Sequence, residues 1–109
     1  MNGSPGRAAG DDGLDGAVAR IGRSARQRNL ARADRVLELL VRRRGPLGAT
    51  DRSEAARLCH AIAGSAGTFG DDELADAARH VEAALRDGRP DRVAPARDVL
   101  HETVRVLRR

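Results

Sequence analysis

The chain has 109 residues, of which 40% are apolar and 33% charged, a balance typical of one globular domain. Its single aromatic residue, Phe69, argues against a base-stacking surface, a β-sandwich core and an aromatic ligand pocket. All 20 basic residues are arginine, and the net charge of +4 is too small and too evenly spread to indicate nucleic-acid binding. The abundance of Ala, Leu, Arg and Glu predicts a small all-α domain.

Cysteine content and hydropathy indicate the compartment. Cys59 is the only cysteine, so an internal disulfide is excluded, and no Cys/His pair has zinc-ligand spacing. The first 16 residues lack the apolar segment of a signal peptide, and no apolar run of about 18 residues follows. We therefore expect a cytoplasmic protein that does not contact the membrane.

The N-terminal third predicts a tail and two helices. Residues 1–13 contain four glycines and one proline without periodic apolar residues, which is typical of a flexible tail. Over 14–21, apolar residues recur at helical spacing and predict a short extra helix that is weakened by Gly16 and Gly22. A stronger pattern over 29–44 predicts the first long helix, ended by Gly45 and Pro46. We expect residues 14–109 to form a single domain.

The next predicted helix covers residues 51–69. Residues 47–50 form a connector, and Thr50 is the expected N-cap of this helix. Leu58 and Phe69 stay in phase across the segment, which predicts that the helix continues through its internal glycines and ends at Gly70.

Two further helices complete the chain. The first is capped by Asp71 or Asp72 and ends at Asp87-Gly88. The last starts near Pro90, and its regular part should begin just before Pro95, because proline is tolerated in the first turn of a helix. Four amphipathic helices with short loops predict an antiparallel four-helix bundle with a short extra N-terminal helix.

The helix over 51–69 has an unusual outward face. At about 100° per residue, one apolar stripe faces the core and His60 faces the opposite side. Glycine within a helix costs about 1 kcal/mol relative to alanine, so glycine near an exposed histidine indicates that another backbone approaches closely. The alternative is an incidental surface histidine with Gly64 as a helix C-cap. The core stripe consists of Ala55, Leu58, Cys59, Ile62, Ala66 and Phe69, and the outward face around His60 of Ala56, Ala63, Gly64 and Gly67.

The segment from His60 to Gly70 and the start of the next helix carry a pattern formed by His60, Gly64, Ser65, Ala66, Phe69, Gly70 and Leu74. This pattern resembles the histidine-containing phosphotransfer (HPt) domain. Members of that family are four-helix phosphocarriers of two-component phosphorelays. The resemblance implies that His60 accepts a phosphoryl group from a receiver-domain aspartyl phosphate and passes it to another receiver. Two positions of the family pattern vary: Ile62 replaces a leucine, and Val81-Glu82 stands for Leu-Glu.

One position departs from the family pattern. The family usually has a lysine three residues after the histidine, where this chain has Ala63. A cation there would lie one turn along the same face and bind a phosphoryl group on the imidazole. Arg57, one turn before His60, and Arg86, on the following helix, are the candidates to contact phosphate instead. The alternative for both is a solvated surface arginine.

The resemblance also implies partners and cofactors. Receiver domains and a hybrid histidine kinase are the expected partners, and Mg²⁺ is expected only on the receiver. No acid pair faces His60 on its own helix, so we expect no metal or other cofactor on this chain. The protein would be a monomeric phosphocarrier rather than a turnover enzyme. His80 and His101 lack flanking glycines and are predicted to be surface residues without a role.

Two other function classes stay open. A pseudo-HPt adaptor would bind a receiver or a kinase without being phosphorylated, and Ala63 keeps this hypothesis open. A basic helical nucleic-acid binder is disfavoured, because arginines are scattered over every helix and no recognition helix stands out.

Overall fold

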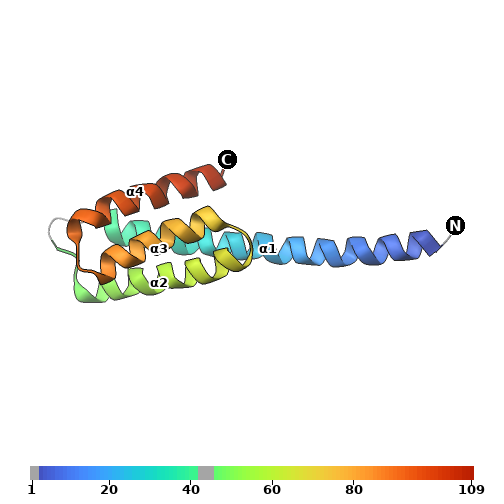
Figure 1. Cartoon of the computed structure of the whole chain (residues 1–109), viewed down its shortest axis with the longest axis horizontal. Helices are drawn as coiled ribbons and strands as arrows, with labels where there is room; N and C mark the ends of the chain where they lie inside the picture. The colour runs from blue at the N-terminus through green and yellow to red at the C-terminus, as the bar shows by residue number, and fades with distance from the viewer. Residues whose placement is uncertain (1–2, 42–45) are drawn as a thin grey trace.

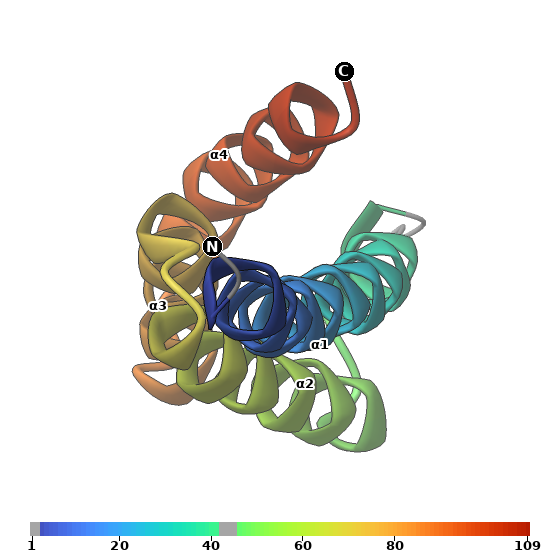
Figure 2. The same ribbon diagram turned by 90° about the vertical axis from the view of Figure 1, so that its right-hand side faces the viewer.

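The protein forms four helices that run alternately in opposite directions (Figure 1). The computed structural model describes residues 3–41 and 46–109, with side chains for 13–40 and 46–109. Figure 2 shows α2 beside both α1 and α3, and α4 packs mainly against α3. The predicted all-α antiparallel bundle is confirmed. The helices are α1 (Gly3–Val41), α2 (Ala49–Thr68), α3 (Asp72–Arg86) and α4 (Pro90–Leu107).

The first helix is longer than the sequence predicts. Instead of a flexible tail and a separate helix over 14–21, α1 is continuous from Gly3 to Val41 and projects far beyond the bundle (Figure 1). The prediction of a separate short helix weakened by Gly16 and Gly22 is wrong, because one glycine costs a helix only about 1 kcal/mol and the residues around Gly22 are mostly good helix formers. The predicted end near Gly45 lies outside the described residues.

The starts of two other helices also differ from the predictions. α2 begins at Ala49, so Thr50 lies inside the first turn and is not the N-cap. α4 begins at Pro90 and continues through Pro95, although the sequence predicts a regular helix only from just before Pro95. The carbonyl of Asp91 loses its helical partner at Pro95, but both residues are exposed, so water can bind that carbonyl.

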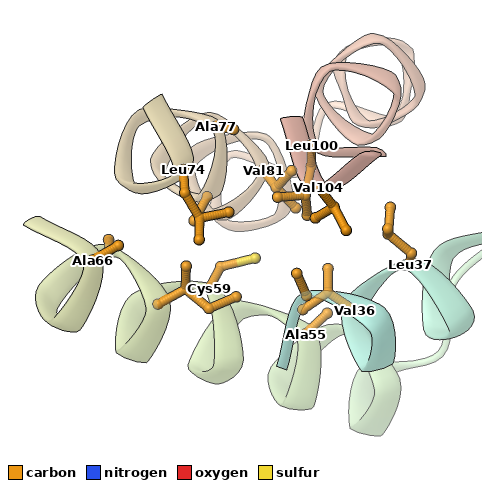
Figure 3. Close-up of a cluster of buried hydrophobic side chains, with 14 of the residues drawn as sticks. Val36, Leu37, Ala55, Cys59, Ala66, Leu74, Ala77, Val81, Leu100 and Val104 are labelled. Carbon is orange, nitrogen blue, oxygen red and sulfur yellow. The ribbon is translucent and has the colours of Figure 1, made fainter. Parts of the chain in front are cut away.

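The core lies between the four helices and consists mostly of alanine, leucine and valine side chains (Figure 3). Its largest fully buried side chains come from all four helices. Close packing of small residues from α2 therefore fixes the position of that helix against its neighbours. The buried residues of α2 are Ala55, Cys59, Ile62, Ala63 and Ala66.

The buried face of α2 is rotated by about 40° from the predicted one. Leu58 is only half-buried and Phe69 is 41% exposed, although both were expected in the core. Ala63, expected on the outward face, is only 6% exposed. Small side chains explain the difference, because alanines allow close helix packing and the contact centres on them rather than on the larger apolar residues.

Gly70 ends α2, as the sequence predicts. Its φ of +83° is a left-handed conformation that favours glycine. The N–H of Asp71 donates to the carbonyl of Ala66 at 2.8 Å, which is the 6→1 hydrogen bond of a Schellman motif. The helix therefore passes through Gly64 and Gly67, which excludes the alternative that Gly64 is a C-cap.

Polar side chains connect α1 to α2 and to the α2–α3 loop. The amide of Asn29 is fully buried, donates from Nδ2 to Ser65 Oγ at 3.1 Å, and accepts at Oδ1 from Arg32 Nη1 at 2.8 Å. Asp71, the N-cap residue of α3, makes no side-chain cap and instead accepts from Arg26 Nε at 3.1 Å. These bonds satisfy a buried amide and fix the point at which α1 leaves the bundle.

Candidate functional site

His60 lies in the middle of α2, and its side chain is 76% exposed. Its Nδ1 lies 3.2 Å from Oε2 of Glu82 on α3. Because a carboxylate only accepts hydrogen bonds, this contact requires the proton on Nδ1. In the neutral ring the lone pair then lies on Nε2, on the other side of the ring. The exposed ring therefore presents a nucleophilic nitrogen to solvent.

Glu82 binds two donors with one carboxylate oxygen. Its side chain is only 13% exposed, and the oxygen that contacts His60 also lies 2.7 Å from Nη2 of Arg86. Arg86 lies one turn further along α3. Two donors on one carboxylate restrict its rotamers, so Glu82 in turn fixes the orientation of the imidazole ring.

A shallow depression beside His60 has a strongly basic lining. Arg52 and Arg57 of α2 and Arg86 of α3 all contribute to it. The two arginines predicted to contact phosphate are therefore brought to the same place as the histidine, and Arg52 joins them. Guanidinium groups bind phosphoryl oxygens through charge-assisted hydrogen bonds, so this surface suits a dianionic group on the imidazole.

The small residues predicted around the histidine differ in their exposure. Gly64 and Gly67 are exposed, and a Cβ added at Gly64 would meet nothing within 4 Å, whereas one at Gly67 would lie 3.4 Å from the guanidinium of Arg79. Ala56 is half-buried and lines the depression. Ala63 was predicted on the outward face, but this prediction is wrong, because its methyl group packs into the core.

Comparison with protein families decides the identity of this arrangement. Residues 23–109 match the Hpt domain family, so the match covers most of the chain and includes α2, α3, α4 and the part of α1 from residue 23 onward. The chain belongs to the Hpt domain family. Comparisons with curated proteins and with solved structures found no significant match. Hpt domains are phosphocarrier modules of two-component signalling and interact with receiver domains and histidine kinases.

Besides Arg52, the sequence analysis of this Hpt domain missed Glu82. The Val81-Glu82 pair is part of the resemblance, but the sequence does not show that Glu82 reaches back to His60. The two residues are 22 positions apart on different helices, so their contact depends on how α2 packs against α3. The feature of the sequence that could have indicated this contact is the acidic Glu82 directly after the buried Val81 on the neighbouring helix.

Other chemically reactive groups of the Hpt domain lie away from the depression. Burial, reinforced by the nearby charge of Glu82, raises the pKa of the Cys59 thiol to about 12. His80 and His101 are exposed on α3 and α4. Within residues 13–40 and 46–109, no group of three His, Cys, Asp or Glu side chains is arranged to hold a metal ion. No helix in the described part of the chain is long and apolar enough to span a membrane.

Proposed function

We propose that this Hpt domain is a phosphocarrier of a cytoplasmic phosphorelay, and that His60 Nε2 accepts the phosphoryl group. The observation that carries the proposal is the exposed imidazole of His60, held through Nδ1 by the largely buried Glu82. An adaptor that only bound a receiver would not need an exposed imidazole with its nucleophilic nitrogen turned outward.

The transfer step follows from this geometry. The Nε2 lone pair attacks the phosphorus of a receiver aspartyl phosphate, the N–P bond forms, and the P–O bond to the aspartate breaks to release its carboxylate. The imidazole keeps its Nδ1 proton and becomes cationic, and the carboxylate of Glu82 at 3.2 Å stabilises that charge. Reversal of the same step passes the group to another receiver. Mg²⁺ is supplied by the receiver, and this chain needs no cofactor of its own.

Arg57 and Arg86 take the place of the missing lysine. The usual position of that cation is occupied by Ala63, whose side chain is buried. Arg57 and Arg86 line the depression beside His60, so both side chains border the surface on which a phosphoryl group on this histidine would lie. We expect each to favour the phosphorylated form by a charge-assisted hydrogen bond.

Phosphate uptake tests the proposal directly. The protein is incubated with phosphorylated receiver domains, and acid-labile phosphate on this chain is measured. His60→Gln should abolish uptake, whereas His80→Gln and His101→Gln should retain it, because both of those histidines lie outside the depression. Uptake that persists in His60→Gln contradicts the proposal. Tight receiver binding without uptake by the wild type would instead support the pseudo-HPt adaptor.

The arginines are tested by the same assay. Arg57→Gln and Arg86→Gln should each slow uptake by about tenfold, which corresponds to one charge-assisted hydrogen bond of about 1.4 kcal/mol. Arg105→Gln is the matched control, because Arg105 is similarly exposed but pairs with Glu102 on α4. Equal rates in all three variants would show that the arginines do not contact the phosphoryl group.

A further inference from the structure

The N-terminal half of α1 carries an apolar stripe that no other part of the described chain covers. Leu14, Val18 and Ile21 are 67%, 59% and 54% exposed. They follow each other at spacings of four and three residues, which places them on one face of the helix. Three large apolar side chains in a row are unusual on a free surface and indicate an interaction site.

The stripe continues the face that α1 buries inside the bundle. Ala25, four residues after Ile21, is on the same face and is fully buried. The α2–α3 loop contacts α1 at this height, where Arg26 binds Asp71. An occupant of the stripe would therefore extend the packing of the bundle along α1, in line with α2 and α3 (Figure 1).

We propose that the stripe pairs with the same stripe of a second copy of this chain in an antiparallel helix pair. A symmetric arrangement would place Leu14 of one copy level with Ile21 of the other, and the two Val18 side chains close to each other. A parallel pair is sterically excluded, because each bundle lies on the paired face of its own α1 and the two bundles would collide. In the antiparallel pair the bundles lie at opposite ends.

Charge favours the same arrangement. Residues 11–15 contain three aspartates and no basic residue, whereas residues 20–28 contain four arginines and no acidic residue. Antiparallel pairing sets the acidic segment of each copy level with Arg20 and Arg23 of the other. Neither Asp15 nor Arg23 takes part in the ion pairs formed among the described side chains. The charges on adjacent helices lie within a Debye length of about 8–10 Å and attract each other.

The contact between the two α1 helices has to end where the bundle of each copy begins. Residues 3–10 of the second copy would reach the α2–α3 loop, and this segment contains three glycines and one proline. These residues are helical in α1, but their low helix propensity allows them to unwind and turn away from the loop when the pair forms. The contact is therefore confined to about two turns per copy around Val18, so the dimer should be weak and depend on concentration. This proposal departs from the monomer expected from the sequence and does not depend on phosphotransfer.

Sedimentation equilibrium on the full chain tests self-association. Over about 10–500 µM protein, the average mass of the wild type should rise from monomer towards dimer. Val18→Asp should weaken association at least tenfold, whereas Val99→Asp should not change it, because Val99 is 52% exposed but lies on α4. A wild type that stays monomeric at every concentration, or equal association of the two variants, overturns the proposal.

Disulfide cross-linking tests the orientation. A mixture of Leu14→Cys and Ile21→Cys proteins should form mixed disulfide dimers, whereas each variant alone should not, because identical residues lie about 10 Å apart in the antiparallel pair. Cys59 is buried and does not compete. Efficient dimers from Leu14→Cys alone would indicate a parallel pair and overturn the proposal. Loss of receiver phosphotransfer in Val18→Asp without any self-association of the wild type would assign the stripe to the receiver instead.

Discussion

Gly64 offers the sharpest separation of stability from function. The helix continues through this position, and an added Cβ would meet nothing within 4 Å. Gly64→Ala should therefore stabilise the protein by about 0.5–1 kcal/mol, because alanine is the better helix former and restricts the unfolded chain. For a domain of this size, that gain raises Tm by about 2–5 °C.

Gly70 supplies the matched control. An added Cβ there also meets nothing within 4 Å, but the residue has a φ of +83°. Gly70→Ala should therefore lose about 1–2 kcal/mol for conformational reasons alone. Thermal and urea unfolding of both variants measure the two free-energy changes. If Gly64→Ala destabilised the protein as much as Gly70→Ala, the continuous α2 would be wrong.

A larger side chain at Gly64 tests the approach of a receiver. Gly64→Gln should keep or raise Tm, but it places a long side chain one turn from His60 on the exposed face. Transient interfaces are small, so loss of close contact near their centre should slow phosphotransfer by at least about tenfold. Gly64→Ala should have a smaller effect on transfer. Unchanged transfer in Gly64→Gln would show that receivers do not approach over this glycine.

Two further predictions concern the core. Ile62→Ala should destabilise the protein by about 3 kcal/mol in urea unfolding, because the side chain is fully buried. Phe69→Ala should cost only about 1–2 kcal/mol, because that ring is 41% exposed. A loss for Phe69→Ala larger than for Ile62→Ala would show that Phe69 is buried. The free energy of unfolding should fall as the pH rises from about 9 towards 12, because the folded state keeps the Cys59 proton longer than the unfolded state does. The chain has no lysine or tyrosine to titrate in this range, so Cys59→Ala should remove the decline, and a decline of the same slope in that variant would contradict the assignment.

The number and order of the bundle helices could be predicted because each helix has its own apolar period and because glycines end α2 and α3. Gly70 and Gly88 lie where the chain needs a left-handed residue, so the ends of α2 and α3 follow from local chemistry. The outward position of His60 could also be predicted, because on the helical wheel this residue lies far from the centre of the apolar stripe. These features depend on residues close together in the sequence.

The features that sequence analysis missed depend on packing between helices. Phe69 was assigned to the core because it is large and apolar, but the contact between helices centres on alanines such as Ala63. The bond from Asn29 to Ser65 and the contact of Glu82 with His60 join residues on different helices. A helical wheel treats each helix alone and therefore cannot show which polar residues meet across an interface.

The length of α1 has a consequence for how the monomer opens. Beyond Ala25, its amides belong to the part of the helix that packs against α2 and α4, so their hydrogen exchange should require unfolding of the bundle. Before that residue, the amides belong to a helix with no tertiary support, and short helices of this kind fray on a microsecond timescale. One continuous rod thus contains two cooperative units, and the Arg26–Asp71 ion pair marks the border between them.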